Sequence, residues 1–138
     1  PALVSPSPSP EPFEIVTKVP VQRWRPHDVK GPSRVPVFFD CAMEIAGLHH
    51  SDPPPEQPFT PPPNPTTSFE CRVSSVCIQR HGEGINMVFL DWSVRRVGLK
   101  ELWTLKWHKG YNTGGPWTKA GNVKAEDWPA WMRKLKDY

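Results

Sequence analysis

The sequence predicts a small α+β domain in which an antiparallel meander of about four strands is followed by two short amphipathic helices. Between positions 72 and 97, short runs rich in β-branched residues alternate with turns that contain glycine or aspartate. After Gly98 the spacing of apolar residues changes to the period of a helix. Seventeen of the nineteen prolines lie within residues 1–65, so regular structure is expected mainly in the second half.

Proline content also sets the domain organisation. Residues 1–33 are predicted to be a Pro-rich, largely irregular linker, and residues 34–138 to be the folded domain with an irregular Pro-rich loop at 42–67. The chain begins with Pro1, carries no signal sequence and has no apolar run of the ~18 residues that a membrane span requires. We therefore expect it to be the C-terminal part of a longer protein.

The meander is expected from four segments with strand composition. A proline near the start of the first segment suggests an edge position. The turn His81-Gly-Glu-Gly84 precedes the third segment, and Asp91 begins the tight connection to the fourth. The expected strands are residues 34–40, 72–80, 85–90 and 94–97.

The two helices are expected from apolar spacing at i, i+3, i+4 and then i+7 or i+8. Asp127 can cap the second helix, and Pro129 is tolerated in a first helical turn. Most tryptophans of these segments should therefore form the core between helices and sheet. The first face holds Leu99, Leu102, Trp103 and Trp107, and the second holds Trp128, Trp131, Met132 and Leu135.

His81 and Asp91 are separated by nine residues and could be suspected of acting as a catalytic pair. They flank one strand, however, and six extended residues span about 20 Å, whereas a catalytic hydrogen bond needs roughly 2.6–3.2 Å. We interpret His81, Gly82, Gly84 and Asp91 as structural turn markers. The Asp91 carboxylate is expected to accept backbone N–H bonds in the turn that follows it.

The His81-x9-Asp91 pattern and the tail that follows resemble a known family. They are similar to the His-x9-Asp-Gly C-terminal domain of prepilin-type, type II secretion pseudopilin-like proteins of planctomycete type. The resemblance covers residues 35–41 and about 71–138, including Val94–His108 and Gly115–Met132. It departs at Trp92, where the signature has glycine, and we expect a turn there that tolerates a side chain.

The resemblance implies a non-enzymatic structural subunit or accessory of a pseudopilus that serves protein secretion. Its partners would be other pseudopilin subunits or secretion-system proteins. It would be located in the cell envelope, periplasm or cell surface. The inner membrane would be reached only through an N-terminal helix that lies outside this sequence.

A second hypothesis comes from the tryptophans, six of which lie after residue 91. Exposed indoles can stack on sugar rings, so the alternative function is a carbohydrate-binding or other extracellular adhesion module with a polysaccharide partner. Because the helical spacing assigns most tryptophans to the core, Trp92 and Trp117 are the candidates for surface contact.

Other classes of function find little support in the sequence. Residues 71–138 carry a net charge of +6, but the cations are interspersed, which favours a solvated surface over nucleic-acid binding. No hydrolase, phosphate-loop or metal-ligand motif occurs, so we expect no enzyme, no metal site and no cofactor. Cys41 and Cys77 are the candidate disulfide pair, and three separate thiols are the alternative.

Overall fold

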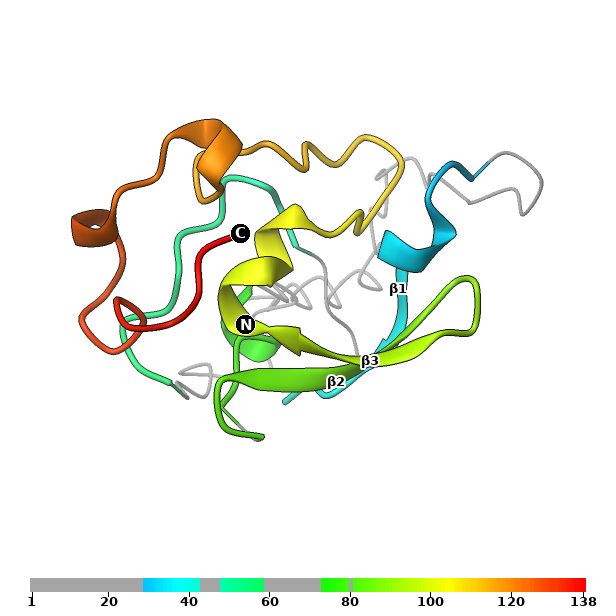
Figure 1. Ribbon diagram of the computed structural model, residues 1–138, viewed down its shortest axis with the longest axis horizontal. Coiled ribbons are helices and arrows are strands. Elements are labelled where there is room, and N and C mark those ends of the chain that lie inside the picture. Colours follow the sequence, from blue (N-terminus) through cyan, green and yellow to red (C-terminus); the bar gives the residue numbers. More distant parts are fainter. Residues whose placement is uncertain (1–28, 43–47, 59–72, 80) are drawn as a thin grey trace, which may run out of the picture.

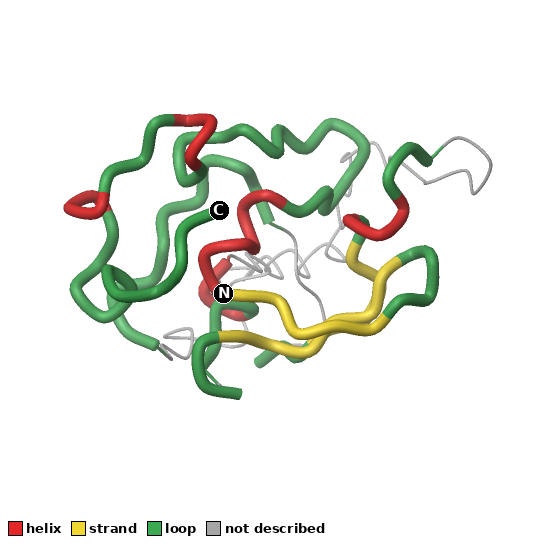
Figure 2. The backbone as a smooth tube through the Cα atoms, in the orientation of Figure 1, coloured by secondary structure: helices red, strands yellow, loops and turns green. Residues whose placement is uncertain are grey.

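The computed structural model describes residues 29–42, 48–58, 73–79 and 81–138. Its sheet has three antiparallel strands in the order β1-β2-β3, namely β1 (Pro36–Phe39), β2 (Gly84–Phe89) and β3 (Val94–Gly98). Short 3-10 helices make up the remaining regular structure (Figure 2). The expected α+β class with an antiparallel sheet is therefore confirmed in this coarse form. Within the described residues the 3-10 helices are η2 (Pro32–Arg34), η3 (Val73–Ser75), η4 (Leu99–Thr104), η5 (Lys119–Gly121) and η6 (Ala125–Asp127).

The β2–β3 hairpin is the best-formed part of the sheet. Ile85 pairs with Val97 and Val88 with Val94, so the two strands are in register from end to end. β1 pairs with the other side of β2, and its register shifts between Pro36 and Phe38. Proline lacks a ladder donor, which suits both this irregularity and the edge position of β1.

The core lies on one face of the sheet. Ile85, Met87 and Phe89 alternate along β2 and are almost fully buried on that face. Trp103 and Trp128 pack over them as an edge-to-face pair with ring centres 5.4 Å apart. In Figure 1 the sheet lies along one side of the molecule, and η4, residues 48–58 and the C-terminal segment lie on the other side. Among the described residues, the core therefore covers one face of the sheet, and Phe38 and Val94 are exposed on the other.

The loop predicted at 42–67 is irregular, but its described part is docked onto the core. The indole N–H of Trp103 donates to the Asp52 carbonyl (2.8 Å), and that of Trp131 donates to the Pro55 carbonyl (2.9 Å). Leu48 is buried as well. Indole groups that are buried need an acceptor, and the backbone of this proline-rich loop supplies it. Residues 43–47 and 59–67 of the predicted loop lie outside the described residues.

Two sequence-based elements were wrong in detail. The described part of the expected strand 72–80 holds η3 and a turn, with the Cys77 N–H bonded to the Val73 carbonyl (2.6 Å). Val76 and Ile78 are buried with Cys77 between them, which does not match an alternating strand. The expected second helix consists of turns, with Met132 N–H bonded to Pro129 and Leu135 N–H to Met132.

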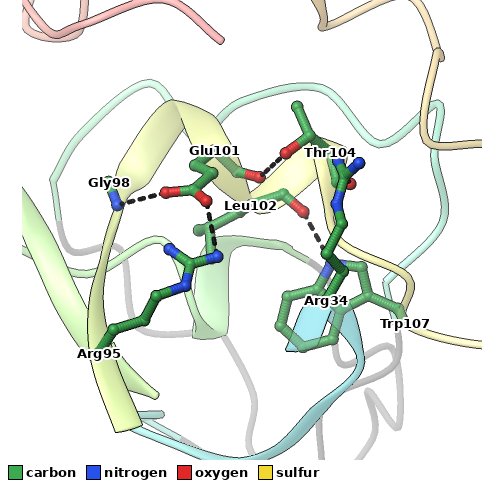
Figure 3. A network of polar contacts seen from close by, with 7 residues as sticks. All are labelled: Arg34, Arg95, Gly98, Glu101, Leu102, Thr104 and Trp107. Carbon is green, nitrogen blue, oxygen red and sulfur yellow. Dashed lines mark hydrogen bonds and ion pairs between the residues drawn. The ribbon is translucent and has the colours of Figure 1, made fainter. Parts of the chain in front are cut away.

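In place of the expected first helix the chain forms the 3-10 helix η4, which ends before Trp107. A polar network joins η4 to the hairpin (Figure 3). The Glu101 carboxylate accepts from Arg95 Nη2 (2.8 Å) on β3 and from the Gly98 N–H (3.4 Å). The Trp107 indole N–H donates back to the Leu102 carbonyl (2.8 Å). These contacts fix the direction in which the chain leaves β3 and keep Arg95 turned toward η4.

Candidate functional site

The candidate site is the uncovered face of the sheet. Side chains directly opposite each other on antiparallel strands share a face, so Phe38, Val88 and Val94 form one continuous row across β1, β2 and β3. Phe38 is 63% exposed and Val94 is 69% exposed, with Val88 partly buried between them. The sequence did not predict this row, because Phe38 and Phe39 are adjacent and the sequence alone does not show which of them faces solvent. We call Phe38, Val88, Val94 and Trp92 the apolar face.

Trp92 lies in the β2–β3 connection, between the strands that carry Val88 and Val94. It is 75% exposed and adopts a left-handed backbone conformation with φ of 64°. The expectation that this turn would avoid positive φ was therefore wrong. Its N–H donates to the Phe89 carbonyl (2.8 Å), which closes the turn. Position 92 thus adopts the conformation that glycine accepts at least cost.

Asp91 holds the same connection from the preceding position. Its Oδ1 accepts from the Ser93 N–H (3.0 Å) and from the Ser93 hydroxyl (2.6 Å). These two bonds lower the pKa of the Asp91 carboxyl, with the hydroxyl contributing more. The carboxylate is fully committed to the turn, which is the arrangement expected of an Asx turn.

His81 does not face Asp91. Its Nε2 lies 3.1 Å from Oδ2 of Asp40, just after β1, and the same Oδ2 accepts from the Asn86 N–H (2.9 Å). Asp40 N–H in turn donates to the Asn86 carbonyl (3.2 Å). His81 therefore connects the turn before β2 to the edge strand β1. His81 and Asp91 therefore lie at opposite ends of β2, where His81 contacts Asp40 and Asp91 contacts Ser93.

The two glycines of the first turn are needed for different reasons. Gly82 has a φ of 69°, in the left-handed region. Gly84 lies so close to β3 that a Cβ there would be 2.5 Å from the Val97 carbonyl oxygen. A side chain at position 84 would force the hairpin apart, so glycine at this position permits the close pairing of β2 with β3.

The remaining predicted site residues lie away from the apolar face. Trp117 is partly buried, with its ring 5.5 Å from that of Trp128, so it belongs to the edge of the core. Cys41 and Cys77 are both thiols, and no disulfide joins them. The Cys41 thiol donates to the Ser75 carbonyl (3.3 Å). Burial raises the pKa of the Cys77 thiol to about 12, which keeps it protonated and a poor nucleophile at neutral pH.

Three histidines gather around Tyr111, an arrangement that the sequence did not indicate. The ring of His50 lies 4.2 Å from that of His49 and 6.0 Å from that of Tyr111, and His108 lies 5.4 Å from Tyr111. Burial, followed by the nearby His49 and His50, lowers the pKa of His108. Burial, followed by Asp52, raises the pKa of Tyr111. Both shifts favour the uncharged forms of His108 and Tyr111 at neutral pH.

Metal binding and membrane crossing gain no support from the part of the chain that the structure describes. Within it, no three side chains of the metal-binding types are placed to hold an ion. Within the same residues, no helix is long and apolar enough to cross a membrane. The described site is a surface suited to contact with another molecule. Its row of apolar side chains lies beside a polar row formed by Asp40, Asn86 and Arg96.

No family model, curated protein or solved structure matches this chain.

Proposed function

We propose that this chain is the C-terminal globular part of a pseudopilin-like subunit and that its apolar face packs against a neighbouring protein in a pseudopilus-type fibre. The observation that carries the proposal is the row of Phe38, Val88 and Val94, with the exposed Trp92 in the adjoining β2–β3 connection. A contiguous group of large apolar side chains on one uncovered sheet face is typical of a protein–protein contact. Single exposed apolar residues would need no such explanation.

The energetics support a contact surface of moderate strength. Burying a valine or phenylalanine side chain that is now exposed is worth about 1.5–3 kcal/mol. Phe38, Val94 and Trp92 together could therefore supply the apolar centre of an interface, while Arg96 and Asn86 lie beside it as polar neighbours. The free energies of such contacts sum over the many subunits of a fibre, so no single contact needs high affinity.

The backbone conformation at Trp92 supports the resemblance to pseudopilin-like proteins, although the residue itself differs from the family signature. The family signature places glycine after the aspartate, and Trp92 has the backbone conformation that favours glycine. The polar groups of the motif are used in turns and strand contacts, which agrees with a non-enzymatic subunit. Its partners would be other pseudopilin or secretion-system proteins in the cell envelope, with membrane anchorage through a preceding helix.

The gene upstream of this segment provides the first test. We expect an open reading frame that continues into an apolar helix that begins like Gly-Phe-Thr-Leu-Ile-Glu, because that helix forms the centre of such fibres. An upstream sequence that encodes an unrelated catalytic domain would contradict the proposal.

A carbohydrate-binding module remains the alternative, favoured by the exposed indole of Trp92. Trp117 would be its natural second platform, yet its ring packs on Trp128. Affinity electrophoresis in a panel of polysaccharides would separate the two functions. Retardation of the chain that is lost in Trp92→Ala supports the sugar module, whereas unretarded migration in every polysaccharide supports the fibre subunit.

A further inference from the structure

A hollow of about 260 Å³ lies at the end of the hairpin where β2 begins and β3 ends, away from the apolar face. Leu99 and Leu135, both nearly buried, give it apolar lining, and the Tyr138 ring adds an aromatic surface. The charged residues around it are Glu83, Arg96 and Lys136. The hollow therefore offers both apolar and charged groups, as a site for a small amphipathic ligand requires.

The C-terminal wall of this hollow is fixed in place. Lys100 is 2% exposed, and its Nζ bonds to Asp137 Oδ1 (2.7 Å) and lies 4.7 Å from the centre of the Trp128 ring. The Lys119 N–H donates to the Tyr138 carbonyl (3.0 Å). A buried lysine that is held by a carboxylate and an aromatic ring is costly to displace. The hollow is therefore preformed, which lowers the entropic cost of binding a ligand.

Two neighbouring arginines on β3 differ in their surroundings. Arg95 is engaged, with Glu101 at 2.8 Å and the Phe89 ring at 4.5 Å. Arg96 has no ion-pair partner among the described residues, and it lies over the bare backbone of the first turn. A Cβ on Gly82 would be 3.1 Å from its Nη2, and a Cβ on Gly84 would be 3.0 Å from its Nε. Arg96 thus lines the hollow, and its guanidinium lies beside the first turn without a carboxylate partner among the described residues.

The second cation, Lys136, completes the rim. Its Nζ lies 4.9 Å from the centre of the Tyr138 ring, and within the described residues it too has no carboxylate partner. With Glu83 as the one acidic residue of the lining, the charged side chains sum to +1. This excess of cationic side chains favours an anion, and Glu83 disfavours a doubly charged anion more strongly than a singly charged one.

We propose that this hollow binds a singly charged organic carboxylate with an apolar body, held by the Arg96 guanidinium. The planar fork of arginine matches the two oxygens of a carboxylate. Leu99, Leu135 and the Tyr138 ring then contact the apolar part. The same chemistry could come from a free organic acid or from the C-terminal residue of a peptide. The hollow shares Arg96 with the polar row beside the apolar face, but the proposal does not depend on the fibre contact.

The test is a two-dimensional ¹H–¹⁵N NMR titration of the full chain with 3-phenylpropanoate, as the free acid, and N-acetyl-phenylalanine, as the peptide end. We expect saturable shifts of the Gly98 and Leu99 amides at millimolar concentrations. Arg96→Gln should weaken binding about ten- to hundred-fold, the usual loss for a hydrogen bond to a charged group. Lys136→Gln should weaken it less, and Lys109→Gln, an exposed cation outside the lining, should not change it.

The outcomes divide clearly. Preference for N-acetyl-phenylalanine assigns the site to a peptide end, and preference for 3-phenylpropanoate assigns it to a free acid. The proposal is overturned if neither probe gives saturable shifts, or if the neutral N-acetyl-phenylalaninamide or inorganic phosphate binds equally well. Unchanged affinity in an Arg96→Gln variant with unaltered thermal unfolding overturns it as well.

Discussion

Replacing Trp92 by glycine should stabilise the domain, although it removes the largest exposed apolar side chain of the described residues. Trp92 and Asn122 are the two non-glycine residues with positive φ in the described part of the chain. Asparagine tolerates that conformation because its side chain can bond locally, whereas tryptophan has no such compensation. The indole is 75% exposed, so it contributes little packing to the folded monomer.

The magnitude follows from two opposing effects. The left-handed conformation costs a residue with a Cβ about 1–2 kcal/mol. Glycine offsets about 0.5–1 kcal/mol of this gain, because it loses more conformational freedom on folding than other residues do. The net gain for Trp92→Gly is then about 0.5–1 kcal/mol. For a domain of this size, that gain corresponds to a rise in Tm of roughly 2–8 °C.

Thermal unfolding followed by far-ultraviolet circular dichroism measures this change directly. Trp92→Ala is the matched control, since it removes the indole but keeps a Cβ at the same φ of 64°. Its Tm should lie near that of the unmodified chain and below that of Trp92→Gly. If the glycine variant melts no higher than the alanine variant, the assignment of backbone strain to position 92 is wrong.

Three further predictions concern the core, the hairpin and the response to pH. Asp137→Asn should lower the free energy of unfolding in urea by about 1–3 kcal/mol, because the buried Lys100 ammonium loses its charged partner. Gly84→Ala should destabilise the hairpin, since its Cβ would meet the Val97 carbonyl at 2.5 Å, and faster hydrogen exchange of β3 amides would show this. The folded-state pKa of His108 is lowered below 6.5, so the unfolded chain binds more protons between those two values. Unfolding free energy should therefore fall as pH drops through that window, and His108→Gln should reduce the slope.

The hairpin could be predicted from sequence because local signals agree there. β2 and β3 are rich in β-branched residues, and the turns at either end of β2 contain Gly82 and Asp91. The C-terminal segment shows the opposite case. Trp128, Met132 and Leu135 are buried as their helical spacing required, yet the backbone forms turns. Spacing predicts which side chains face the core more reliably than it predicts the hydrogen bonding that brings them there.

The apolar face could not be predicted because it depends on pairing between distant segments. Phe38 becomes part of a row only through its register with Val88, fifty residues later in the chain. The shift between Pro36 and Phe38 decides which of the two phenylalanines points outward. The contact of His81 with Asp40 depends on the same pairing, and so a motif read along β2 alone could not reveal it.

The most direct test of the fibre-contact proposal is photo-crosslinking from the apolar face in the cells that naturally produce the protein. Val94→p-benzoylphenylalanine places the probe in the row, and Ala120→p-benzoylphenylalanine places it at an exposed position on η5. Irradiation should join position 94, but not position 120, to a second copy or to another pilin-like subunit identified by mass spectrometry. Equal yields from both positions, or no adduct from position 94, would contradict the proposal.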